Sequence, residues 1–124
     1  MAITLDGTAG ITASGSVSDS IGNVRDIPIN NQTSAYILAA TDDGKTISIT
    51  TGGVTVNANI LSAGSIVSIF NNSGSNQTIT QGATVTMRQA GTANTGNRTL
   101  AQYGVCTVLC VASNTFVISG AGLG

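Results

Sequence analysis

From residue 34 onward, short apolar runs alternate with polar and turn-forming residues. The runs cover residues 35–38, 46–50, 54–56, 65–70, 77–80, 84–88, 104–112 and 115–119. Alternation with a period of two, in stretches rich in Thr, Val and Ile, is typical of strands that bury one face. Apolar positions with the helical spacing are missing, and Glu is absent. The pattern predicts an all-β fold, a small antiparallel sandwich or jelly-roll-like barrel.

The run over residues 105–112 is apolar on both of its faces. Such a run is expected of a central strand that is covered on both sides. Cys106 and Cys110 lie on the same side of this strand, about 13 Å apart, which is too far for a disulfide. We expect both cysteines to be small buried apolar residues.

The connections consist of residues that favour turns. Thr41 to Gly44 predict a tight turn in which Asp42 and Asp43 are hydrated. Residues 71–76 are all Asn, Ser or Gly, which accept left-handed backbone angles and hydrogen-bond to nearby amides. We expect this loop to be a hairpin connection, with a ligand-contacting loop as the alternative.

The first part of the chain has a different pattern. Ile3 and Leu5 alternate once with polar residues, and small residues dominate from there to residue 23. We expect residues 1–33 to form an extended N-terminal arm and residues 34–124 to form a single β domain. The sequence Ile27-Pro28-Ile29 would lead from the arm into the domain.

Composition narrows the classes of partner. Of the 124 residues, only 7% are charged, and the net charge is −1. Clustered Lys and Arg for binding nucleic acid are missing, and no stretch approaches the roughly 18 apolar residues of a membrane helix. We therefore expect neither nucleic acid nor a membrane as a partner. A net charge near zero favours association and so points to an oligomer.

Candidate chemistry is scarce. Without His, a Ser–His–Asp or Cys–His arrangement is impossible. The two cysteines lack further zinc ligands, and the Asp spacing does not fit a calcium loop. We expect no enzymatic activity, no catalytic residues, no metal and no cofactor. Arg88 and Arg98, which flank the polar loop 90–97, are expected to be solvated rim residues or contacts with a partner.

Several segments resemble bacteriophage virion proteins, including the ends of tail-fibre proteins from aquatic phages. These segments are residues 1–11, 47–56, 70–82, 90–104 and 107–122. The resemblance implies a structural protein on the outer surface of the virion, made in the host cytoplasm. A tail fibre usually carries such a segment at its end, whereas here it is nearly the whole chain. A small β domain with an arm looks more like a capsid decoration, or cement, protein.

Two functions are compatible with this resemblance. A decoration protein would be a homotrimer that binds the major capsid protein and stabilises the head, with Ile3 and Leu5 on the arm and Arg88 and Arg98 on the domain as contact residues. The alternative is a tail-fibre or receptor-binding tip that contacts the host surface. An enzyme such as a polysaccharide depolymerase is disfavoured because no carboxylate pair is well placed.

Overall fold

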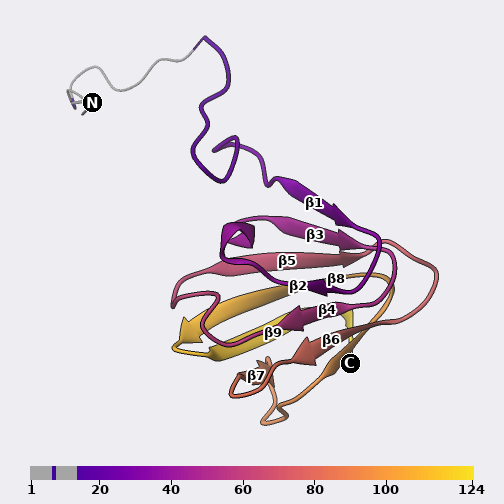
Figure 1. Ribbon diagram of the computed structural model, residues 1–124. Helices are drawn as coiled ribbons and strands as arrows, with labels where there is room; N and C mark the ends of the chain where they lie inside the picture. The colour runs from indigo at the N-terminus through magenta and orange to yellow at the C-terminus, as the bar shows by residue number, and fades with distance from the viewer. Residues whose placement is uncertain (1–6, 8–13) are drawn as a thin grey trace.

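The computed structural model describes Gly7 and residues 14–124. Its strands form one mixed sheet that curls into a nearly closed barrel (Figure 1). The hydrogen-bonded order is β1-β3-β5-β8-β6-β4-β2, and β9 pairs with both β7 and β8. The all-β, barrel-like or sandwich-like fold that the sequence predicted is confirmed.

Every predicted run overlaps one strand. The strands are β1 (Ile29–Gln32), β2 (Tyr36–Ile37), β3 (Thr46–Ile49), β4 (Val54–Val56), β5 (Ile66–Asn71), β6 (Gln77–Gln81), β7 (Thr86–Gln89), β8 (Arg98–Ala112) and β9 (Thr115–Leu123). A short 3-10 helix, η1 (Ala40–Asp42), is the single helical element of the described residues.

The first six strands wind as a coil rather than as hairpins. β1, β3 and β5 pair in parallel, and β2, β4 and β6 pair in parallel in the other half of the barrel (Figure 1). The prediction of antiparallel pairing was wrong, because the sheet has five parallel and three antiparallel strand pairs. The period of two determines which face of a strand is buried. That face is the same whether the neighbouring strand runs parallel or antiparallel.

β8 joins the two halves of the barrel. Residues 105–109 of β8 pair with β5 and residues 98–100 pair with β6, both antiparallel. Between these two parts lies Tyr103, whose φ of 54° is left-handed. β9 then returns along β8 from the turn at residues 113–114. The two strands approach so closely that a Cβ at Gly120 would collide with the carbonyl of Val105, which explains the need for glycine there.

The loop over residues 71–76 is not a hairpin. It connects β5 and β6, which pair with opposite parts of β8 and not with each other. The loop is held by side chains: Asn71 Nδ2 donates to the carbonyl oxygens of Leu100 and Ala101, at 3.0 and 2.9 Å. Ser73 Oγ donates to Asn71 Oδ1 at 2.7 Å. Side-chain hydrogen bonds of this loop thus take the place of the backbone hydrogen bonds that the paired strands of a hairpin would have formed.

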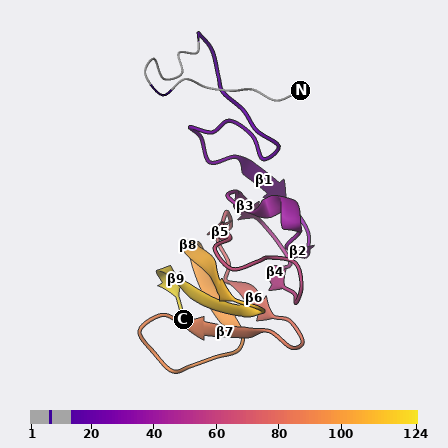
Figure 2. The same cartoon turned by 90° about the vertical axis from the view of Figure 1, so that its left-hand side faces the viewer.

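The sheet begins inside the range that was predicted as the arm. β1 starts at Ile29, five positions before the predicted boundary at residue 34. Its inward positions carry Asn30 and Gln32 in place of apolar residues, so the alternation that marks the other strands is missing. Residues 14–28 lead away from the barrel at the β1 end (Figures 1 and 2).

The core lies between the two halves of the barrel and forms one cluster. Both cysteines belong to it and are free, as predicted. Its buried members are Leu38, Ile47, Ile49, Val54, Val56, Leu61, Val67, Ile69, Ile79, Val85, Met87, Leu100, Cys106, Val108, Cys110, Phe116 and Ile118. Because all of these residues lie at position 38 or later, residues 14–28 contribute nothing to the core.

Candidate functional site

The predicted contact residues have different surroundings. Arg88 is exposed on β7, where its side chain can meet a partner. Arg98, at the start of β8, is only partly exposed. Ile3 and Leu5 lie outside the described residues. Of these four positions, the structure therefore describes only Arg88 and Arg98.

The Arg98 guanidinium has a structural function within its own loop. It donates to Gln89 Oε1 at 2.8 Å, to the carbonyl oxygen of Thr95 at 3.1 Å and to that of Asn97 at 2.8 Å. These bonds order the polar loop 90–97 against β7. A partner would have to compete with them in order to engage this side chain.

The first edge strand, β1, has one open side. The carbonyl oxygens of Pro28 and Gln32 accept hydrogen bonds from Thr46 and Thr50 of the β3 segment, at 2.9 and 3.1 Å. Backbone groups of successive residues point to opposite sides of a strand. The N–H and C=O groups of Ile29 and Asn31 therefore point away from β3, where no described strand pairs with them.

β2 is open in the same way. The N–H groups of Tyr36 and Leu38 donate to the carbonyl oxygens of Gly53 and Thr55, at 3.1 and 3.0 Å. The backbone groups of Ile37 accordingly face the free side, and β2 ends the sheet order opposite β1. An unpaired edge of this kind is a template for another strand.

Exposed apolar side chains surround both edges. Ile29 and Ile37 are 58% and 55% exposed, and Val24 and Ile27, which precede β1, are 56% and 64% exposed. We call these four residues and the free edges of β1 and β2 the open end. The open end coincides with the point where the N-terminal segment leaves the barrel (Figure 2).

A buried polar cluster closes the core beneath the open end. Asp42 is only 1% exposed, and its Oδ2 accepts from Tyr36 Oη at 2.7 Å and from the Ala39 N–H at 2.8 Å. Asn30 Nδ2 donates to Asp42 Oδ1 at 2.9 Å and to Tyr36 Oη at 3.0 Å. Burial, and then the hydrogen bond and charge of Asp42, raise the pKa of the Tyr36 phenol. The cluster thus links β1, β2 and η1.

The prediction of a hydrated Asp42 was wrong. The segment forms a turn of 3-10 helix that carries the carboxylate inward, where it accepts the N–H of the residue before the helix. An acidic residue at the third position of a helix is the usual signal for such a contact. Here the signal is weak because Ala39 offers no side chain for capping. Asp43, which is partly buried, instead accepts from the Ile66 N–H at 3.0 Å.

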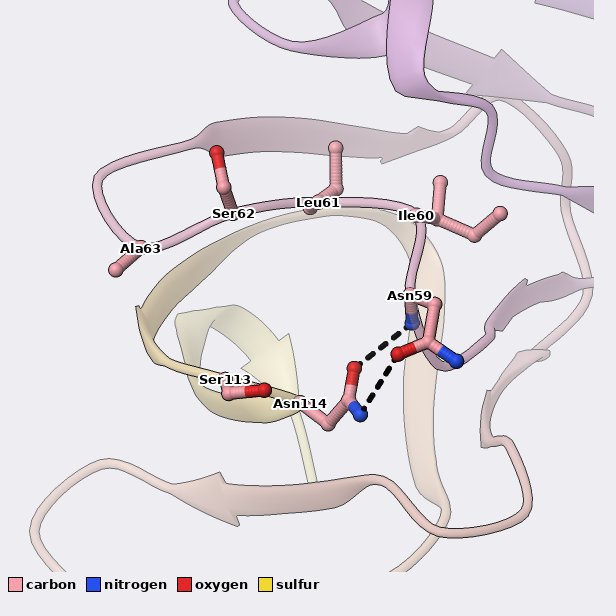
Figure 3. A pocket seen from close by; sticks show the side chains of 7 residues that line it. All are labelled: Asn59, Ile60, Leu61, Ser62, Ala63, Ser113 and Asn114. Carbon is pink, nitrogen blue, oxygen red and sulfur yellow. Dashed lines mark hydrogen bonds between the residues drawn. The ribbon is translucent and has the colours of Figure 1, made fainter.

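A shallow pocket of about 560 Å³ lies at the turn between β8 and β9 (Figure 3). The Asn59 N–H donates to Asn114 Oδ1 at 2.8 Å, and Asn114 Nδ2 donates to Asn59 Oδ1 at 3.2 Å. The left-handed φ values of the two residues, 64° and 51°, are of the kind that Asn tolerates. The pair fastens the loop to the turn, and no local sequence pattern predicted it. The pocket is lined by Asn59, Ile60, Leu61, Ser62, Ala63, Ser113 and Asn114, none of them ionisable.

The acidic side chains of the described residues do not form a metal centre. Asp19, Asp26 and Asp43 border a second depression, but each of them already accepts hydrogen bonds within the protein. Asp19 Oδ1 accepts from the N–H groups of Ile21 and Gly22. Across Gly7 and residues 14–124, no group of three or more carboxylates and thiols is placed to hold a metal ion.

The buried thiols predict a loss of stability at high pH. Burial raises the pKa of the Cys106 thiol to about 12 from an ordinary value of 9.0. As the pH rises between these values, the unfolded chain releases its proton while the folded chain keeps it, so stability is lost across this range. Urea unfolding from pH 8 to about pH 11 should show a steeper decline for the wild type than for Cys106→Ala. Equal slopes would contradict this account.

Comparison of the chain with protein-family models, with curated proteins and with solved structures found no match. In the part of the chain that the structure describes, there is no helix with the length and hydrophobicity that crossing a bilayer requires.

Proposed function

We propose that this protein is a non-enzymatic structural component of a bacteriophage virion, and specifically a capsid decoration (cement) protein that attaches through its open end. The open end carries the proposal, because main-chain groups that no described strand pairs with lie there beside exposed apolar residues, at the base of the N-terminal arm. The resemblance of the segments named above supports the assignment to a phage particle.

The chemistry of the open end suits a partner that offers extended chain. A strand that adds to β1 or β2 would pair with the main-chain groups of Ile29, Asn31 or Ile37. Alternate side chains of the added strand would then pack beside Ile29 or Ile37, which are more than half exposed. Long, exposed edges are usually blocked by charges or by proline. Pro28 stands just before β1, but the edge itself carries only Ile29, Asn30, Asn31 and Gln32.

The shell of a virus head presents many copies of the same surface. Attachment of a decoration protein as an oligomer would join several weak contacts into one strong one by raising the effective concentration. The resemblance implies binding to the major capsid protein, and Arg88 is an exposed residue that a capsid contact could use. A domain with few ionisable groups also has few stability terms that depend on pH.

Labelling of intact virions decides between the head and the tail. Immunogold with an antibody against this protein is expected to distribute over the heads of the phage that encodes it. Gold restricted to the tail or its tip would replace the decoration function with the alternative, a tail-fibre or receptor-binding module. Gold on neither part would overturn the virion assignment.

Removing residues 1–26 is expected to abolish attachment and leave the domain folded. The core cluster lies entirely at position 38 or later, so the thermal midpoint should change by no more than about 3 °C. Co-sedimentation with capsids purified without the protein measures attachment, with full-length protein as the positive control. Truncated protein that still pellets with capsids would show that the arm is dispensable.

A further inference from the structure

The outward side of β8 is apolar and uncovered. Val105, Leu109 and Val111 project from it and are 46%, 37% and 47% exposed, although β8 pairs on both edges, with β5 and with β9. The inward residues of the same strand, Cys106 and Val108, are buried in the core. The run that the sequence predicted to be covered on both faces is therefore covered on only one within a single chain.

The registers of β5, β8 and β9 arrange this surface in three rows. Ile66, Leu109 and Val117 form one apolar row, and Phe70, Val105 and Ala121 form the other. Between them runs a row of hydroxyl residues, Ser68, Thr107 and Ser119. We call these nine residues the outer face.

The outer face contains no charged residue. Two charges stand at its margin: Arg88 is beside Val117 in the register, and Asp43 Oδ1 accepts from the Ile66 N–H at 3.0 Å. A typical solvent-exposed surface is about one quarter to one third charged. Covering the outer face would thus remove apolar side chains from water without the cost of desolvating a charge.

We propose that the outer face binds a second copy of this chain, face to face, about a two-fold axis that follows the hydroxyl row. Rotation about this axis places each apolar row of one subunit over the other apolar row of its partner. Each strand then lies over the same strand of the partner. Leu109 then meets Val105 of the partner subunit, Ile66 meets Phe70 of the partner subunit, and Thr107 meets the partner's Thr107. Apolar groups cover apolar groups and hydroxyls cover hydroxyls, which is the self-complementarity that a two-fold interface requires. A second copy is therefore the occupant that the pattern of the outer face fits.

The size of the outer face sets the strength of the pair. Three strands about 4.8 Å apart, each contributing about 13 Å of length, give a patch smaller than the roughly 800 Å² per partner of a standard interface. We expect reversible association, with a dissociation constant in the micromolar range or weaker. The inference does not rest on the proposed function, because the pair can form whether or not the protein binds a capsid.

Sedimentation equilibrium from about 1 μM to about 1 mM tests the proposal. The wild type should pass from monomer to dimer, and Leu109→Glu should weaken the dimer by about 30-fold or more, as expected for an apolar anchor that the interface buries. Ile37→Glu is the matched control, since Ile37 is a more exposed apolar strand residue outside the outer face, and it should dimerise like the wild type. A monomer throughout, a trimer, or a dimer that Leu109→Glu leaves unchanged would each overturn the proposal.

Cross-linking tests the axis without relying on a destabilising variant. In Thr107→Cys, a short bismaleimide should join the two subunits, because the axis brings the two 107 positions together. The native thiols are buried, and the pKa of Cys106 is raised to about 12, so neither should react in the folded protein. Ile37→Cys is the control and should remain uncross-linked. Dimers that cross-link through position 37 and not through position 107 would overturn the two-fold arrangement.

Discussion

Asn71→Ala is expected to lower the free energy of unfolding by about 4 kcal/mol. Asn71 has no exposed surface, and its Nδ2 donates to the carbonyl oxygens of Ser75, Leu100 and Ala101 at 2.7, 3.0 and 2.9 Å. Alanine removes these bonds and leaves at least two carbonyl groups of the bend in β8 without their donor. Each buried polar group that loses its partner costs about 1–3 kcal/mol.

The same substitution should loosen the polar network next to Asn71. Ser73 Oγ donates to Asn71 Oδ1 and accepts from Gln77 Nε2, at 2.7 and 3.2 Å. Gln77 also accepts the Gly53 N–H at 2.9 Å, so the network ties the loop to the turn before β4. Hydrogen bonds in such chains support one another, and the loss of one member weakens the rest.

Urea unfolding of Asn71→Ala measures the effect, and Asn72→Ala is the matched control. Asn72 is the next residue and the same type, but its side chain is exposed, so its variant should stay within about 0.5 kcal/mol of the wild type. If Asn71→Ala lost less than about 1 kcal/mol, the side-chain bonds would not be what holds the loop.

Asp42→Ala is the second large effect, with an expected loss of about 3 kcal/mol. The carboxylate is the acceptor for Tyr36 Oη, Asn30 Nδ2 and the Ala39 N–H. Its removal leaves these donors without an acceptor, in a place that solvent barely reaches. It also disconnects η1 from β1 and β2, so the open end should lose its order before the rest of the barrel unfolds.

Asp42→Asn removes the negative charge and keeps the shape of the side chain, so it tests the two contributions separately. The carboxamide of Asn has one acceptor oxygen where the carboxylate has two, so it can keep the donors on only one side of the group. This variant should therefore lose about half as much stability as Asp42→Ala. Asp26→Asn is the control, because Asp26 is exposed and accepts from Asn23 Nδ2 at the surface. Hydrogen exchange of the β1 and β2 amides, measured with thermal unfolding, reports the local effect. Unchanged exchange in Asp42→Ala would contradict a role of the cluster in holding the open end.

The open end and the outer face have different consequences for assembly. A strand that joins β1 or β2 would use main-chain groups at the edges of the sheet, whereas a second copy would use side chains on its outward surface. Because edge groups point sideways in the plane of a sheet, pairing through the outer face leaves them accessible. A two-fold pair would therefore present two copies of each edge, which would strengthen attachment to a repeating surface.

The sequence by itself determined which residues face inward. Alternating Ile and Val positions, such as Ile47 and Ile49 in β3, are buried as predicted, since burial of an apolar side chain is favourable whichever strands are its neighbours. The all-β class, the positions of the main strands and the burial of both cysteines depend on this rule alone. The same pattern also indicated that residues 105–112 have two apolar faces, and the second of these contributes the central strand of the outer face.

The tertiary structure decided which strands pair and which polar residues are buried. The period of two is equally compatible with parallel and antiparallel neighbours, so it did not specify the coil of β1 to β6. Asn71 and Asp42 resemble their neighbours Asn72 and Asp43 in sequence. They differ because distant carbonyl groups converge on Asn71, and the side chains of Asn30 and Tyr36 converge on Asp42. β1 was missed for the same reason, because Asn30 faces inward toward a buried carboxylate that only the folded chain places there.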